Sequence, residues 1–216
     1  MVFSRQLTNE EFEILSTIQE FVRSAHAESD SHDYAHVLTV ARNAIKIAKE
    51  IPESVDPFVC VCAALLHDIG KTKHYFTQMH GFVGSAIAEE VLEGRGVDPL
   101  FRDRICRAVI RHTPTSMMPP ETPEEKILFD ADCLDRLGLM GLIRGFVGKS
   151  GSMDEILSRY MKRRMNDYDT LHYDISRKIG EEKQEELEKF VEIIRNRLDK
   201  RMDSIVNIFM DENLFI

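Results

Sequence analysis

The chain has 216 residues, of which 43% are hydrophobic and 30% are charged. This composition is typical of one globular domain and excludes a disordered chain. The formal net charge of −9 argues against a nucleic acid as the partner, although one local positive site can still hold a small anion. The longest apolar run, Phe58 to Leu66, has nine residues, whereas a membrane-spanning helix needs about 20, so no membrane partner is expected.

Helical patterns follow one another along the chain. Thr8 and Glu11 form a capping-box pattern, which predicts a helix over 8–27. Further helices are expected over 34–50, 56–69, 80–94, 98–112, 125–147, 153–165, 170–200 and 202–210. No segment shows the alternation of apolar and polar residues that is typical of strands. The sequence therefore predicts an all-α fold, in which residues 1–29 pack on a core of 30–150 and residues 151–216 complete the same domain.

The start of the chain and its cysteines bear on location. Glu10, Glu11 and Glu13 stand among the first apolar residues, a pattern unlike that of a signal peptide, so a cytoplasmic location is expected. The four cysteines should then be reduced. Cys60 and Cys62 have the wrong spacing for a zinc or redox pair and fit small side chains in a buried helix.

His67 and Asp68 are the first residues that indicate chemistry. They end an apolar helix, where an ionised carboxylate beside an imidazole is costly unless it is paired or bound to a metal. Imidazole nitrogen and carboxylate oxygen together suit a divalent ion. Lys71 follows one turn later, where an ammonium group can meet a phosphate oxygen.

Two more residues are candidate ligands. His36 lies in an amphipathic helix and Asp132 lies near the start of another. Each has a plainer interpretation when taken singly, because a lone helical histidine is commonly a structural residue and an aspartate at a helix start faces the helix dipole. The ordered set of His36, His67, Asp68 and Asp132 changes that interpretation.

This set resembles the HD superfamily of metal-dependent phosphohydrolases, in which a histidine, a His-Asp pair and a final aspartate lie on separate helices of an all-α core. Residues 67–71 are similar to its signature segment. The resemblance implies a single-domain bundle of about 8–10 helices with a divalent metal held by His36, His67, Asp68 and Asp132. Manganese is favoured, and Mg²⁺, Co²⁺, Fe²⁺, Ni²⁺ and Zn²⁺ are the alternatives.

Segments 32–36, 130–135, 138–144 and 171–198 further resemble a subgroup of small bacterial and archaeal HD proteins. Some of these convert nucleoside triphosphates to monophosphates and pyrophosphate, so the implied partner is a small phosphorylated substrate, in particular a nucleotide. Thr39 and Cys133 depart from the subgroup, which usually has arginine at both places, and this affects substrate placement rather than metal binding. Residues 71–73 lack the acidic pair of HD enzymes that cleave guanosine tetraphosphate, which disfavours that activity.

The resemblance leads to candidate catalytic residues: Asp68, Lys71 and Asp130. Asp68 is a candidate both as ligand and as proton acceptor. Asp130 reaches the metal only if its helix begins after it, because residues i and i+2 of a helix point about 200° apart. The general base is therefore left open between these two aspartates.

Substrate binding is expected from Lys71, His80, His112 and Arg144. For His80 and His112 two interpretations stay open. They can donate hydrogen bonds to substrate phosphate or to ligand carboxylates, or they can bind a second metal that shares Asp68 with the first. His74 is a further candidate for the cleft.

Several functions remain as alternatives to nucleotide phosphohydrolysis. Within the enzyme class they are phosphodiester hydrolysis, nucleoside monophosphate hydrolysis and, with two irons, oxygen-dependent bond cleavage. From another class comes a nucleotide sensor without turnover. The acidic C-terminal helix, with apolar residues from Leu187 to Leu198, is also a candidate surface for a homodimer, although such amphipathicity equally fits packing within one chain.

Overall fold

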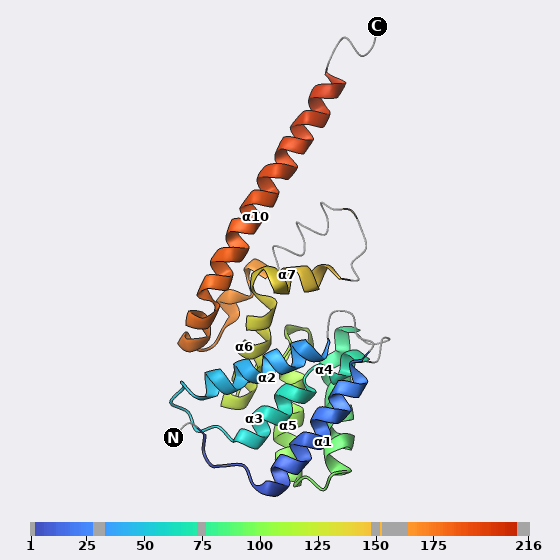
Figure 1. Ribbon diagram of the computed structural model, residues 1–216, viewed down its shortest axis with the longest axis vertical. Coiled ribbons are helices and arrows are strands. Elements are labelled where there is room, and N and C mark those ends of the chain that lie inside the picture. The colour runs from blue at the N-terminus through green and yellow to red at the C-terminus, as the bar shows by residue number, and fades with distance from the viewer. Residues whose placement is uncertain (1–2, 28–32, 73–76, 148–151, 153–163, 211–216) are drawn as a thin grey trace.

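The computed structural model describes residues 3–27, 33–72, 77–147, 152 and 164–210. All regular elements in these ranges are helices, which confirms the expected all-α, single-domain fold (Figure 1). The described α-helices are α1 (Asn9–Ala25), α2 (Tyr34–Ala48), α3 (Pro57–Leu66), α4 (His80–Glu93), α5 (Pro99–Arg111), α6 (Pro123–Arg136), α7 (Gly138–Phe146) and α10 (Asp174–Phe209). Short 3-10 helices are η1 (Ile69–Thr72), η2 (Thr77–Met79), η3 (Pro114–Ser116) and η5 (Tyr168–Thr170).

Helix starts follow from local side-chain chemistry. The capping box predicted at Thr8 and Glu11 is present, and a second one forms between Thr122 and Glu125 at the start of α6. The Asp33 carboxylate caps α2 by accepting a hydrogen bond from the backbone N–H of His36. These caps satisfy backbone donors that have no partner within the helix, and so they fix where α2 and α6 begin.

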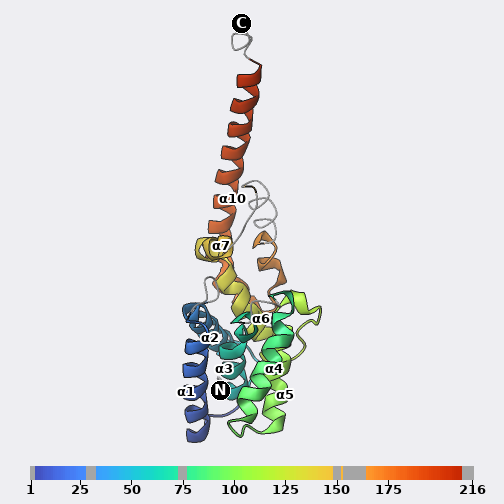
Figure 2. The ribbon, with the colours of Figure 1, turned by 90° about the vertical axis from the view of Figure 1, so that its right-hand side faces the viewer.

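The short apolar helix α3 lies at the centre of the bundle. It packs against α1, α2, α5 and α6, which surround it in both ribbon views (Figures 1 and 2). Phe58 and Leu66, near its two ends, are almost fully buried. Burial of apolar surface on all sides of α3 is the main force that holds its last residue, and the His-Asp pair after it, in place.

Three predicted helices have boundaries in the structure that differ from the expected ones. The helix predicted over 125–147 is divided, because Leu137 is extended and Gly138 adopts a φ of 75°, a conformation that favours glycine. The helices predicted over 170–200 and 202–210 are one, α10, with no break between them. The helix predicted over 153–165 falls almost entirely outside the described residues. Among the described helices, none is long and apolar enough to cross a membrane.

Candidate metal centre

His67 and Asp68 directly follow α3 in the interior of the bundle, and both are fully buried. The Nδ1 atom of His67 lies 2.8 Å from the carbonyl oxygen of Ala64, one turn earlier in the same helix. A carbonyl only accepts, so Nδ1 carries the proton and Nε2 presents a lone pair. The fold thus sets the tautomer that a metal ligand needs.

Three of the predicted ligands form one cluster: His36, His67 and Asp132. They come from α2, the end of α3 and α6, and all three are buried. The Nε2 atoms of His36 and His67 are 3.2 Å apart, and His36 Nε2 is 3.6 Å from an Asp132 oxygen. Residues nearly 100 positions apart therefore present nitrogen and oxygen atoms to one point.

A second buried cluster lies beside the first and contains Asp68, His80 and His112. His80 begins α4 and His112 ends α5, and their Nε2 atoms are 3.3 Å apart. His112 Nδ1 is 2.6 Å from the Val109 carbonyl oxygen, so its Nε2 also presents a lone pair. The structure thus brings together the two histidines for which two interpretations were open.

Asp68 stands between the two clusters. Its Oδ2 atom is 3.3 Å from His36 Nε2 and 3.5 Å from His67 Nε2, on the side of the first cluster. Its Oδ1 atom is 3.4 Å from His112 Nε2 and 3.8 Å from His80 Nε2, on the side of the second. One carboxylate in this position can serve two adjacent cations, one with each oxygen.

These donors fit a divalent cation. His36 Nδ1 faces a carboxylate and His67 Nδ1 faces a carbonyl, so the two Nε2 lone pairs point at each other across 3.2 Å. Such an approach is repulsive unless a proton or a cation lies between the nitrogens. Imidazole nitrogens with carboxylate oxygens are the donors of transition-metal sites and also of Zn²⁺ sites. Both clusters offer this combination.

Two residues that sequence reasoning did not single out, Asp135 and Arg136, support the side chains of the first cluster through hydrogen bonds. Asp135 Oδ2 lies 2.6 Å from His36 Nδ1, and Arg144 donates hydrogen bonds to both the carboxylate and the carbonyl of Asp135. Arg136 donates to the Asp132 carboxylate and to the Cys133 sulfur. Their positions one turn after Asp132 are the signal that could have revealed Asp135 and Arg136.

The pKa shifts of His67 and Asp132 favour ligation, whereas that of His36 favours the imidazolium, whose Nε2 proton a bound cation would displace. Burial lowers the pKa of His67, so its imidazole stays neutral. For His36 burial acts in the same direction, but hydrogen bonds to Asp135 and Asp68 outweigh it and raise the pKa. Burial raises the pKa of Asp132, yet the nearby Arg136 and the histidines hold it well below its usual range. The carboxylate is therefore ionised at neutral pH.

The remaining predicted residues have varied positions. Lys71 Nζ donates to Asp68 Oδ2 at 2.9 Å, at the edge of the clusters. Arg144 donates hydrogen bonds to Asp135, which in turn contacts the candidate ligand His36. Asp130 is fully buried and uses both oxygens elsewhere: they accept hydrogen bonds from the backbone of His172 and Tyr173 and from His172 Nδ1. It tethers the start of the C-terminal segment. His74 lies outside the described residues.

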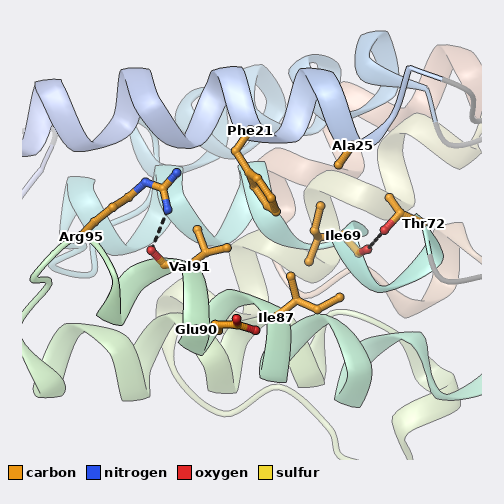
Figure 3. A pocket seen from close by; sticks show the side chains of 8 residues that line it. All are labelled: Phe21, Ala25, Ile69, Thr72, Ile87, Glu90, Val91 and Arg95. Atoms are coloured by element: carbon orange, nitrogen blue, oxygen red, sulfur yellow. Dashed lines mark hydrogen bonds between the residues drawn. The ribbon is translucent and has the colours of Figure 1, made fainter.

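A separate hollow of about 550 Å³ lies between α1, η1 and α4 (Figure 3). Its walls are mostly apolar, with Phe21 from α1, Ile69 from η1 and Val91 from α4, and Arg95 lies at one end. It contains none of the ligand histidines or aspartates, but Ile69 and Thr72 belong to the turn that also carries Lys71. The hollow is therefore separate from the two metal-ligand clusters, although it shares the η1 turn with Lys71.

Comparison with known proteins relates this centre to the HD domain. Residues 33–137 match the HD domain, and this range contains all four ligands expected from the resemblance as well as His80 and His112. YpgQ of Bacillus subtilis is 28% identical over 177 residues, which are 76% of this chain and 83% of YpgQ. The expected relationship to the HD superfamily is thereby confirmed.

Solved structures have the same fold. YpgQ in complex with ADP aligns with a TM-score of 0.68 at 23% identity, covering 87% of this chain and 96% of that one. A predicted HD superfamily hydrolase from an uncultured Thermotogales bacterium aligns at 0.59 and 26% identity, covering 86% and 91%. An HD-superfamily hydrolase from Bacillus thuringiensis aligns at 0.66 and 20% identity, covering 88% and 98%.

Proposed function

Because residues 33–137 form an HD domain with two adjacent clusters of metal-ligating groups, we propose that this chain is a metal-dependent phosphohydrolase that acts on nucleotides. The observation that carries the proposal is the position of Asp68, with one oxygen toward each cluster. Buried, ionised carboxylates beside neutral imidazoles are costly to maintain, and a bound cation offsets that cost.

His36, His67, Asp68 and Asp132 would hold the primary ion. Manganese is favoured, with magnesium, cobalt, iron, nickel and zinc as alternatives, since mixed nitrogen and oxygen donors suit several of these ions. When bound, a divalent ion would act as a Lewis acid toward a phosphate oxygen and make a water molecule more acidic. The alternative roles of His80 and His112 stay as two variants of the proposal: ligands of a second ion, or donors to phosphate.

The chain's own residues would position the substrate and move the proton. Lys71 is partly exposed and lies 2.9 Å from Asp68, so its ammonium group can exchange this carboxylate for a substrate phosphate. Asp68 is the remaining candidate base, because the oxygens of Asp130 are engaged by His172 and Tyr173. Arg144 would act through Asp135, by orienting His36.

The nucleotide part of the proposal is supported by the YpgQ complex with ADP, a property of that protein. The rivals differ in their products: a phosphodiesterase gives an opened diester, and a monophosphatase gives orthophosphate. A sensor binds and gives no product. We also propose a cytoplasmic location, and self-association through the C-terminal helix because α7 and α10 expose apolar residues.

The test is a screen of purified, manganese-loaded protein against nucleoside mono-, di- and triphosphates and cyclic dinucleotides, with products separated by chromatography. We expect turnover that Asp68→Asn abolishes together with most of the bound metal, while Asp174→Asn, a change at a fully exposed aspartate, leaves both intact. Metal binding and activity that both survive in Asp68→Asn would show that the site is wrong. Tight nucleotide binding without turnover would favour the sensor.

A further inference from the structure

The C-terminal helix α10 extends beyond α6 and α7, the helices on which it packs (Figures 1 and 2). Its 36 residues, at about 1.5 Å each, make a rod of about 54 Å. The first part of α10 contacts α6 and α7, and Ile194 and Leu198 still pack against the cluster around Leu142, whereas the outer end runs past the other described helices in both ribbon views (Figures 1 and 2). Because most of the stability of a helix in a protein comes from packing of its apolar face, the outer part of α10 is expected to be covered by another surface.

One apolar stripe continues along the whole of α10. Its residues recur in steps of four, three, four, four and three, the spacing of an 11-residue repeat, which keeps them on one face of the helix: Leu187, Val191, Ile194, Leu198, Met202 and Ile205. Leu187 and Val191 are buried against Leu142 of α7. Farther along the same face, Met202 is 53% exposed and Ile205 is 38% exposed. The face that packs within the chain thus continues outward on residues that are partly exposed.

Helix α7 has a second apolar face of its own. Leu142 and Phe146 face α10. About 100° or more around the helix lie Met140 and Ile143, which are 77% and 58% exposed, and Val147, directly after the helix, is 44% exposed. Exposed apolar residues in such a stripe, as opposed to scattered ones, mark an interaction surface.

Charge is divided between the two halves of α10. Residues 181–192 contain six glutamates and two lysines, a net charge of −4. Residues 195–203 contain four basic and two acidic residues, a net charge of +2, and none of Arg195, Arg197, Lys200 and Arg201 forms an ion pair with another described residue. An antiparallel neighbour of the same sequence would place basic halves on acidic halves, whereas a parallel one would oppose like charges.

We propose that the chain forms an antiparallel homodimer in which the outer half of α10 from one copy lies over α7 and the acidic half of α10 of its partner. Met202 and Ile205 of one copy would then cover Met140 and Ile143 of the other, and the arrangement occurs twice around one two-fold axis. Both uncovered apolar faces and both charge excesses are matched by this single arrangement. The inference is independent of the proposed hydrolase activity.

Sedimentation equilibrium of the full chain tests the association. We expect a dimer for the native sequence, and at least a 100-fold weaker dimer for Ile205→Asp and for Met140→Asp. Asn207→Asp, the same charge on the opposite face of α10, should remain dimeric. Circular dichroism and metal content confirm that each variant is folded. A native chain that is monomeric at 100 μM, or a dimer that survives both apolar-to-aspartate changes, overturns the proposal.

Orientation is tested by cross-linking between copies. Chains with Ile205→Cys and with Met140→Cys are mixed and treated with a short bis-maleimide, and the linked peptides are identified by mass spectrometry. Links between positions 205 and 140 of different copies are expected, because the antiparallel arrangement brings these two together. Links between two copies of position 205 as the main product would mean that the outer halves pair with each other, which overturns the arrangement.

Discussion

His36 and Asp135 are 99 positions apart in the chain, yet Nδ1 of the histidine lies 2.6 Å from a carboxylate oxygen of the aspartate. The carboxylate accepts a hydrogen bond from Nδ1–H, so Nε2 is the nitrogen that can offer a lone pair to the cluster. Arg144 of α7 holds the same carboxylate from the other side. One aspartate therefore connects a candidate metal ligand on α2 with a helix outside the HD domain match.

The first prediction concerns this contact. Asp135→Asn removes the negative charge that orients and polarises His36, and we expect metal affinity to fall about 10- to 100-fold. Isothermal titration calorimetry with Mn²⁺ measures the change in metal affinity. Asp174→Asn serves as the control, because that side chain is fully exposed and pairs only with Arg177. An unchanged affinity in Asp135→Asn would mean that Asp135 has only a structural role.

The contrast between Asp132 and Asp135 shows what the sequence could and could not predict. Helix type and most helix starts follow from caps and periodicity, and the four candidate ligands follow from the resemblance of their ordered set to the HD superfamily; all of these are local or linear patterns. The direction in which a carboxylate points depends on packing between distant helices. Asp130, Asp132 and Asp135 lie within six positions of α6, yet one tethers His172, one faces the cluster and one supports His36.

The division of 125–147 into α6 and α7 was missed for a related reason. Leu137 and Gly138 continue the apolar pattern, so periodicity alone indicates no break. The turn between α6 and α7 requires glycine at position 141, because a Cβ atom there would lie 2.1 Å from the carbonyl oxygen of Arg136. The requirement for close backbone approach can be recognised only once α7 is placed in three dimensions.

A second prediction distinguishes the two interpretations of His112. Its Nε2 is 3.4 Å from Asp68 Oδ1, so His112→Ala removes one donor of the second cluster and leaves the first intact. If the native protein binds two ions, the variant should retain one, as measured by inductively coupled plasma mass spectrometry. If it binds one, that ion should stay and KM should rise at least tenfold. Native metal content together with native kinetics would exclude both interpretations.

The third prediction separates tethering from catalysis at Asp130. Its carboxylate accepts hydrogen bonds from two backbone N–H groups and an imidazole in a fully buried position. Asp130→Asn turns an NH₂ group toward some of these donors, and we expect unfolding in urea to require about 1–3 kcal/mol less. Activity per folded molecule and metal content should be unchanged, and the exposed Asp169→Asn is the matched control. Loss of turnover at native stability would instead identify Asp130 as the base.

A fourth prediction concerns Gly70, which follows the His-Asp pair by two positions. A Cβ atom at Gly70 would lie 2.1 Å from the His80 carbonyl oxygen and 2.6 Å from the Gly84 nitrogen, both of them backbone atoms. Gly70→Ala must therefore push η1 away from α4 and separate Asp68 from His80, at a cost of about 1–3 kcal/mol or more. Thermal unfolding and metal content measure both effects. In Gly94→Ala the nearest atom is at 3.3 Å, so this variant should be nearly neutral.

The last prediction uses an ion-pair group far from the metal clusters. Arg5 donates to both oxygens of Glu11 and also to Asp56, and its side-chain hydrogen bond is the main cause that lowers the pKa of Glu11 below 4.5. A lowered pKa in the folded state means that the carboxylate stabilises the protein above its usual pKa and that this contribution disappears as the pH falls through the folded-state value.

Glu11→Gln keeps the capping pattern but removes the charge, so it isolates the ion pair. We expect the variant to be about 1 kcal/mol less stable at pH 7, because the pair is partly exposed. The difference from the native chain should shrink steadily below pH 4.5. Urea unfolding at several pH values measures it, with Glu10→Gln as the exposed neighbour control. A difference that stays constant down to pH 2 would attribute the loss to packing, not to charge.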